Sequence, residues 1–291
     1  MQRVSDPLPR ARSRRRGALF LLRLAATAAA GGCSRGPERV VLVTIDTLRA
    51  DRLGCYGREG ARTPTLDRIA EEGVRFEAAL SPAPLTLPSH ASLMTGLDPP
   101  DHGVRHNLVF RLEADLPTLA ERMRAAGFET AAFVGAMVLE REFGLARGFD
   151  TYDDQMPPRW GAGNTRRSER SADALVDATI AWMASAPERF FLWVHFYDPH
   201  TEYEPPPRYA REFPNDPYAG EIAFVDAELG RLLEALQQRW PGERTLTVVV
   251  SAHGESLYEH GEPTHSYGIY DSTQRVPLLM RGPGLPQGLQ V

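Results

Sequence analysis

Three polar side chains come directly after runs of apolar residues, at the points where predicted strands end. Asp46 follows the run at 40–45, His200 follows "RFFLWVHFYDP", and His253 follows "TLTVVVSA". Apolar runs of this kind predict strands that are buried on both faces. Polar groups at the carboxyl ends of parallel strands are typical of catalytic and ligand-binding sites. We therefore expect these residues, far apart in the sequence, to meet at one edge of a sheet.

One residue in the turn "SAHGE" does not fit a chemical site. His253 and Glu255 carry groups that can bind or transfer protons, but Ala252 lies between the strand and His253. A methyl group offers nothing to a metal ion or a substrate. The turn therefore raises the question of why a site would have an alanine at its centre.

The predicted elements around these residues alternate between strand and helix. In "TPTLDRIAEEG" we predict a helix with Thr63 as cap, Pro64 at the first helical position and Gly73 as the stop. A Pro-rich loop leads into a short helix in "SPAPLTLPSHASLMTG", and the polar segment 157–170 is predicted to be a loop. Further helices are predicted in "LPTLAERMRAAGF", "SADALVDATIAWMASA" and "AGEIAFVDAELGRLLEALQQR", and further strands in "ETAAFVG" and, last, "RVPLLMRGPG". This order predicts an α/β fold with a mostly parallel, doubly wound sheet and helices on both faces.

Composition excludes several classes of protein. The 291 residues are 42% hydrophobic and 24% charged, which is ordinary for a globular chain. The net charge of -5, without a basic stripe beyond the N-terminus, argues against nucleic-acid binding. Two cysteines, Cys33 and Cys55, cannot form a disulfide framework or a cysteine-based zinc site.

Residues 1–33 have the layout of an export signal. The basic stretch "PRARSRRRG" precedes the apolar "ALFLLRLAATAAAGG" and Cys33. "AAGGC" resembles the cleavage box of bacterial lipoproteins, in which the cysteine becomes lipidated. We therefore expect an exported chain, periplasmic or in the outer membrane, with a lipid anchor at Cys33. The alternative is a disordered basic tail. The folded domain is expected at 38–291.

Six stretches between residues 40 and 284 resemble the N-terminal domain of the sulfatase family, within the alkaline phosphatase superfamily. In family order they are "VTIDTLRADRLGCYG", "TPTLDRIAEEGVRF", "TLPSHASLMTGLDPPDHGVRHN", "VHFYDPHTEYEPP", "YAGEIAFVDAELGRLL" and "HGESLYEHGEPTHSYGIYDSTQRVPLLMRGPG". The resemblance implies an alkaline phosphatase-like fold and one divalent cation, Ca, Mg, Mn or Zn. It also implies hydrolysis or transfer of a sulfate or phosphate ester carried by a small molecule, a glycan or a lipid.

The resemblance assigns a nucleophile and a first metal ligand. Asp46 matches the first metal-binding aspartate, with a strand-end cap as the alternative, and many relatives have a second aspartate where Thr47 stands. Thr86, in "TLPSH", matches the nucleophile, which typical sulfatases make by oxidising a cysteine or serine to formylglycine. Threonine cannot follow that route, because its methyl group replaces a hydrogen that the oxidation needs. We therefore expect a metal-activated Thr86 without formylglycine; the alternative role is a helix N-cap.

Three histidines complete the predicted catalytic set. His90 replaces an arginine of the family, so charge stabilisation beside Thr86 should be weaker and pH-dependent; the alternative is a solvent-facing side chain. His200 matches a histidine that contacts the transferred group or the leaving oxygen, and His265 matches a residue near the substrate. His195, on the preceding strand, is interpreted as structural.

The resemblance also explains why Ala252 is unusual. Relatives read Ser-Asp-His-Gly-Glu at this turn, and both the aspartate and the histidine bind the metal. Here the metal ligands are predicted to be Asp46, Thr86 and His253, with Glu255 as a group that could swing in. One carboxylate holds a hard cation less tightly than two or three. Two functions follow: a metal-dependent ester hydrolase or transferase, or a catalytically impaired or non-catalytic relative.

Relatives also continue beyond the position that matches Val291. They add strands and a C-terminal subdomain that closes one side of the cleft. We expect this chain to lack that subdomain, as a fragment, a truncated reading frame or a minimal version. Its last predicted strand would then lie at an unprotected sheet edge.

Overall fold

The computed structural model describes residues 36–157 and 169–291. The predicted export signal at 1–33, including Cys33, lies outside the described residues. So does most of the polar segment 157–170.

The centre of the fold is an eight-stranded sheet with the order β4-β3-β5-β1-β6-β7-β2-β8. The strands from β4 to β6 are parallel, whereas β7 runs antiparallel to both of its neighbours. The bounds are β1 (Arg39–Ile45), β2 (Val74–Leu80), β3 (Glu129–Val134), β4 (Thr151–Asp153), β5 (Phe190–Phe196), β6 (Thr245–Ser251), β7 (Arg275–Arg281) and β8 (Leu289–Gln290). The predicted α/β fold with a mostly parallel sheet is confirmed.

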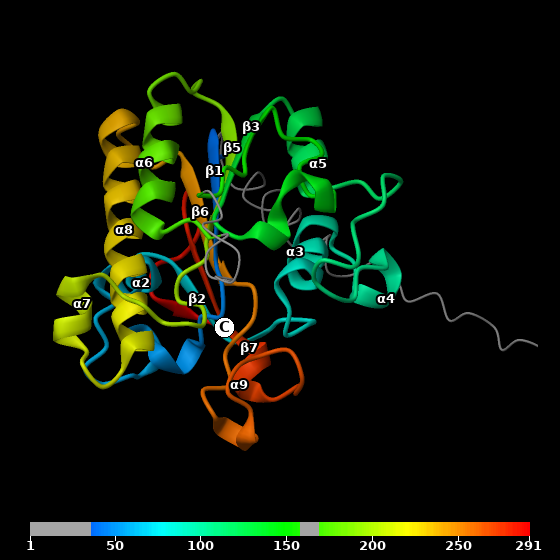
Figure 1. Ribbon diagram of the computed structural model, residues 1–291. Helices are drawn as coiled ribbons and strands as arrows, with labels where there is room; N and C mark the ends of the chain where they lie inside the picture. The colour runs from blue at the N-terminus through cyan, green and yellow to red at the C-terminus, as the bar shows by residue number, and fades with distance from the viewer. Residues whose placement is uncertain (1–35, 158–168) are drawn as a thin grey trace, which may run out of the picture.

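Helices cover the sheet on both faces (Figure 1). One layer contains α2 (Pro64–Glu71), α6 (Ala172–Met183) and α8 (Pro217–Arg239), and the other contains α3 (Thr86–Thr95) and α5 (Leu119–Ala125). Shorter helices are α4 (Pro99–His102), α7 (Pro207–Glu212) and α9 (Asp271–Gln274), and the 3-10 turns are η1 (Ala50–Arg52), η2 (Gly54–Tyr56), η3 (Met137–Leu139), η4 (Arg141–Phe143) and η5 (Glu259–Gly261). In the described part of the chain, no helix is both long and apolar enough to cross a membrane.

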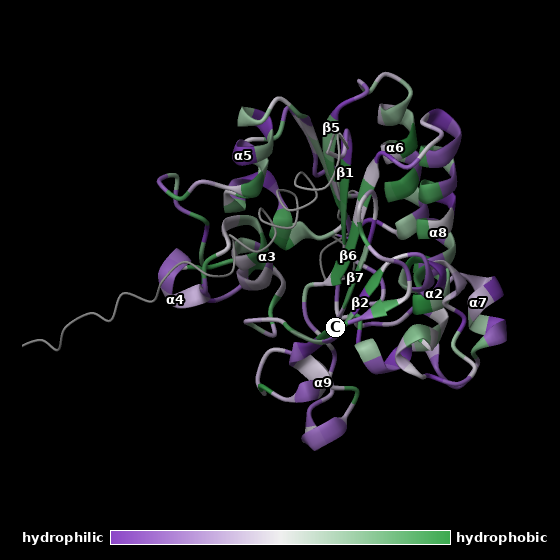
Figure 2. Ribbon diagram, turned by 180° about the vertical axis from the view of Figure 1, so that it is seen from behind, coloured by the Kyte–Doolittle hydropathy of each residue, from purple (hydrophilic) through white to green (hydrophobic). Residues whose placement is uncertain are grey.

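Strand β1 shows why the apolar runs predicted buried strands. Val41, Val43 and Ile45 pack in the cluster that includes α6 and α8, whereas Leu42 packs in the cluster that includes α3. Successive side chains of a strand point to opposite faces, so a strand between two helical layers must be apolar throughout. The hydropathy colouring shows this apolar centre between more polar outer surfaces (Figure 2).

The ends of α2 differ in detail from the prediction. Thr63 is the N-cap residue and Pro64 begins the helix, but the Thr63 hydroxyl accepts from the Gly54 backbone N–H at 3.0 Å instead of capping α2. The C-cap is Glu72. Gly73 follows it, and a Cβ there would collide with the Met280 carbonyl oxygen on β7. Gly73 therefore allows close packing against the sheet.

The expectation that the last predicted strand lies at a sheet edge was wrong. The predicted last strand, β7, lies inside the sheet between β6 and β2, and β8 follows it at the edge beside β2. Strand β2 was not predicted, and most of its residues are only partly buried or exposed. Such a strand lacks the continuous apolar run that marks β1.

Candidate active site

The three predicted metal ligands converge at the carboxyl edge of the sheet. Asp46 follows β1 and His253 follows β6, its parallel neighbour, while Thr86 is the first residue of α3. Thr86 Oγ1 lies 3.1 Å from Asp46 Oδ2 and 3.4 Å from His253 Nε2. His253 Nε2 lies 3.2 Å from Asp46 Oδ1. All three side chains are buried, so one carboxylate, one imidazole and one hydroxyl share a site shielded from water.

The start of α3 leaves the Thr86 hydroxyl free to face Asp46. Leu85 is the N-cap residue, so the N-cap alternative for Thr86 is wrong. The side-chain oxygen of Asn107 accepts from the Leu87 N–H at 2.9 Å and thereby satisfies one of the unpaired donors of the first turn. Asn107 was not predicted to have this role, because a cap supplied from another loop leaves no local signal in the sequence.

A strained turn fixes the Asp46 carboxylate. Thr47 has a φ of 50°, which is rare for a β-branched residue. Its backbone N–H donates to Asp46 Oδ1 at 3.2 Å, and its hydroxyl donates to the Pro199 carbonyl. Burial raises the pKa of Asp46 to about 7, because the charged form is poorly solvated there.

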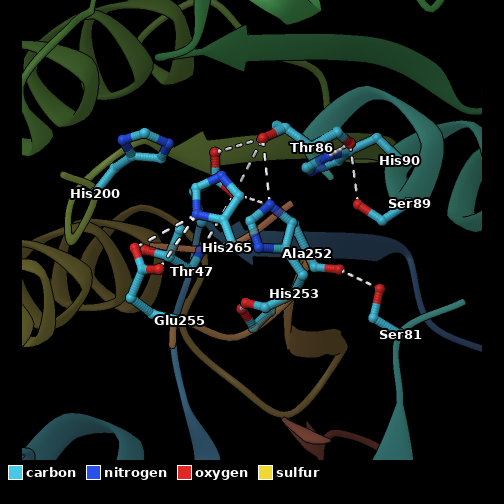
Figure 3. A network of polar contacts seen from close by, with 12 residues as sticks. Thr47, Ser81, Thr86, Ser89, His90, His200, Ala252, His253, Glu255 and His265 are labelled. Carbon is cyan, nitrogen blue, oxygen red and sulfur yellow. Dashed lines mark hydrogen bonds and ion pairs between the residues drawn. The ribbon is translucent and has the colours of Figure 1, made fainter. Parts of the chain in front are cut away.

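The backbone at Ala252 is held on both sides. Its N–H donates to the Ile45 carbonyl at 3.2 Å, and its carbonyl accepts from the Ser81 hydroxyl at 2.6 Å. Only 6% of the residue is exposed. Figure 3 shows Ala252 directly beside His253, on the side toward Ser81. The strand end therefore keeps a defined position for a side chain that, as alanine, carries no donor atom.

A row of imidazole rings leads away from the three converging groups (Figure 3). The ring centroid of His265 lies 4.4 Å from that of His253 and 5.0 Å from that of His200. The His200 Nδ1 lies 2.7 Å from both the Thr201 carbonyl oxygen and the Tyr197 hydroxyl. Burial lowers the pKa of His200 to about 4 and that of His253 well below its usual value. Both rings are therefore neutral at pH 7.

Glu255 is engaged by its own set of donors. Its Oε1 accepts from the Ser256 N–H at 3.0 Å, and its Oε2 accepts from the hydroxyls of Thr201 and Thr264 at 3.3 and 3.2 Å. His265 Nδ1 lies 3.4 Å from the same carboxylate. Burial tends to raise the pKa of Glu255, but the hydrogen bond from His265 holds it below its usual value. Glu255 would have to leave these partners to reach a cation beside Asp46.

His90 lies behind the nucleophile position. It is fully buried, so the solvent-facing alternative is wrong. Its Nδ1 lies 2.7 Å from the Thr86 carbonyl oxygen and its Nε2 lies 3.1 Å from Thr44 Oγ1. Burial lowers the pKa of His90 to about 4, so the ring carries no charge at pH 7. These contacts do not support the predicted role of His90 in charge stabilisation, which stays a prediction.

The residues present suit a divalent cation, but their side chains are not already arranged as a metal site. Among the described residues, no three His, Cys, Asp or Glu side chains are already arranged to hold a metal ion. Asp46 and His253 supply two such groups, and the Thr86 hydroxyl supplies a third donor. Their separations of 3.1 to 3.4 Å suit donors that share one cation with bonds of about 2.0–2.6 Å. A cation would also offset the unfavourable burial of the Asp46 carboxylate.

Comparisons with known proteins identify the family. The Sulfatase family model matches residues 38–290. The uncharacterized sulfatase YidJ of Escherichia coli is 24% identical over 320 residues, an alignment that covers 84% of this chain and 62% of the relative. The Delta 4,5-hexuronate-2-O-sulfatase of Bacteroides thetaiotaomicron is 23% identical over 316 residues, covering 88% of this chain and 65% of the relative. The chain thus spans just under two thirds of the length of these curated relatives.

The fold is shared with a solved hydrolase. The phosphonate monoester hydrolase of Agrobacterium radiobacter superposes with a TM-score of 0.74 at 23% identity, covering 88% of this chain and 70% of that one. The family model spans nearly all of the described residues, and the sheet has the order and the strand-end site described above. The chain therefore belongs to the sulfatase family, with the alkaline phosphatase-like fold.

Proposed function

We propose that this chain is a metal-dependent hydrolase of sulfate or phosphate esters in which Thr86 is the nucleophile. The observation that carries the proposal is the position of Thr86 Oγ1. It lies at the first residue of α3, 3.1 Å from the Asp46 carboxylate and 3.4 Å from the His253 imidazole. A hydroxyl is a weak nucleophile by itself, so it needs a partner that lowers its pKa.

Each side chain of the site would have a separate role in ester cleavage. Asp46, Thr86 and His253 would hold the cation, which when bound lowers the pKa of the Thr86 hydroxyl and binds an oxygen of the substrate. The amino-terminal end of α3 favours negative charge on the attacking oxygen. His265 and His200 follow His253 in the row of rings, with centroids 4.4 and 5.0 Å apart, and would contact the leaving group, whose oxygen takes its proton from the water consumed in hydrolysis. Glu255 faces His265 Nδ1 at 3.4 Å and so orients that ring.

Threonine at position 86 favours phosphoesters. It cannot be converted to formylglycine, so we expect no formylglycine-generating partner. The hexuronate sulfatase relative is named for a sulfated sugar, which supports sulfated or phosphorylated glycans, besides small-molecule or lipid esters, as the substrate class. We also propose export and a lipid anchor at Cys33, on the motif "AAGGC".

A second candidate function is a sulfatase-fold protein without catalysis. Ala252 favours it, because its methyl group places no second carboxylate beside Asp46 and His253. In that case the site would bind an ester without turning it over.

Turnover of aryl phosphates and aryl sulfates by the purified, metal-supplemented chain separates the two functions. We expect Thr86→Ala to abolish turnover and Thr86→Ser, which keeps the hydroxyl, to retain part of it. Ser185→Ala, at an exposed serine outside the site, is the control for nonspecific effects. Turnover that survives Thr86→Ala would exclude Thr86 as the nucleophile. Absence of turnover with every cation and ester would support the non-catalytic function.

A further inference from the structure

His195 presents a buried nitrogen to the site. The side chain lies on β5 beside Thr44 of β1 and is fully buried. Within the described part of the chain, its Nε2 has no hydrogen-bond partner. The same atom lies 3.8 Å from Asp46 Oδ2. Buried polar atoms are almost always paired, so this nitrogen requires an explanation.

The protonation of His195 can be derived from its neighbours, starting at His90. The Thr86 carbonyl can only accept, so the His90 Nδ1 at 2.7 Å must carry a hydrogen. His90 is fully buried with a carbonyl and a hydroxyl as partners, which favours the neutral ring. Its Nε2 is then an acceptor and accepts a hydrogen bond from the Thr44 hydroxyl.

The Thr44 hydroxyl transmits this constraint to His195. The hydroxyl has only one hydrogen, which it donates in the hydrogen bond to His90. It also accepts a hydrogen bond from Trp193 Nε1 at 2.9 Å. His195 Nδ1, at 2.9 Å, must therefore donate to Thr44 Oγ1. In the neutral ring, Nε2 then carries a lone pair. Two acceptors, this nitrogen and a carboxylate oxygen, face each other in a buried site.

We propose that His195 Nε2 is a ligand of the cation, together with Asp46, His253 and Thr86, and takes the place of the carboxylate that position 252 lacks. This inference rests on the cation of the proposed function. A positive ion between the lone pair and the carboxylate satisfies both acceptors at once. Binding requires the Nε2 of His195 and the Asp46 carboxylate, now 3.8 Å apart, to turn toward a common ion.

The donor set determines which ion is preferred. Two imidazoles, one carboxylate and one hydroxyl form a site rich in nitrogen. Imidazole suits Zn²⁺ and its first-row neighbours, whereas Ca²⁺ and Mg²⁺ prefer sets made only of oxygen. The chain should therefore bind Zn²⁺ more tightly than Ca²⁺ or Mg²⁺.

Calorimetric titration of the metal-free chain with Zn²⁺ and, separately, with Ca²⁺ tests the inference without reference to catalysis. We expect His195→Gln to weaken Zn²⁺ binding by at least about tenfold. His106→Gln, at an exposed histidine, is the matched control and should leave the affinity unchanged. Thr44→Val keeps the His195 imidazole but removes the partner of its Nδ1, and should weaken Zn²⁺ binding by about 10–100-fold. Circular dichroism of the metal-free variants verifies that each is folded.

The visible spectrum of the Co²⁺-loaded chain gives a second measurement, because it responds to the loss of an imidazole ligand. We expect it to change in His195→Gln and not in His106→Gln. Equal Zn²⁺ affinity in His195→Gln and the parent, tighter binding of Ca²⁺ than of Zn²⁺, or no metal binding at all would each overturn the inference. Zn²⁺ binding that depends on His195 without ester turnover would leave it intact and count only against the proposed function.

Discussion

Replacing Ala252 by aspartate should destabilise the folded chain in the absence of metal and stabilise it when metal is bound. The backbone of Ala252 is held by Ile45 and Ser81, so the substitution adds a carboxylate at a fixed position beside His253. The site already contains the buried Asp46 carboxylate, whose pKa is raised to about 7. A second acid in the same place increases the negative charge without adding a protein cation.

The size of each effect can be estimated separately for the metal-free and the metal-bound chain. Without metal, an uncompensated buried charge costs about 3 kcal/mol of unfolding free energy. With metal, restoring a primary ligand should raise affinity by at least the ~10–100-fold that outer-shell losses cost, which equals about 1.4–2.7 kcal/mol. The gain should be larger for Ca²⁺ and Mg²⁺ than for Zn²⁺, because hard ions depend more on carboxylates.

Metal titrations and thermal melts of the parent, Ala252→Asp and Ala252→Asn measure both effects. We expect Ala252→Asp to melt below the parent in chelator and above it in saturating metal, with increased phosphoesterase activity. Ala252→Asn has a similar shape without the charge, so it should show neither the loss in chelator nor the full gain in metal. A parent chain that binds Ca²⁺ as tightly as Ala252→Asp would refute the reasoning, since another group would then be completing the site.

Three further predictions concern other parts of the chain. Asn107→Ala should lower the unfolding free energy by about 1 kcal/mol in denaturant titrations, because Asn107 caps α3 through the Leu87 N–H; an unchanged midpoint would contradict this. Burial raises the pKa of Glu221 to about 9. Between about pH 4.5 and 9 the folded state therefore keeps a proton that the unfolded state has lost. The unfolding free energy falls as pH rises through that range. Glu221→Gln should therefore exceed the parent in stability by up to a few kcal/mol at pH 8 and much less at pH 5; a difference independent of pH would argue against a shifted pKa. Finally, mass spectrometry of material exported from a bacterial host should find a lipidated Cys33 that Cys33→Ser abolishes, and an intact, unlipidated N-terminus would count against the lipid anchor.

The sequence alone was enough to predict the fold and the meeting of Asp46 and His253. Each follows an apolar run, and such runs in alternation with helices imply parallel strands whose carboxyl ends share one edge. The position of Thr86 at the start of a helix was also predictable, from "TLPSH" after a Pro-rich loop. These features depend on short-range patterns, which a single chain displays without knowledge of its partners in space.

The tertiary structure decided what surrounds those groups. It made His90 a buried neutral ring, because α3 packs onto the sheet over Thr44, which no local pattern could show. It also placed His195 against Thr44 through the register of β1 and β5, with its Nε2 3.8 Å from Asp46 Oδ2. Which strand lies beside which, and in what register, depends on the packing of the whole domain, because side chains distant in sequence compete for the same buried surface. The helices and strands therefore follow from local sequence, whereas protonation, burial and the completeness of the site follow from how the elements pack.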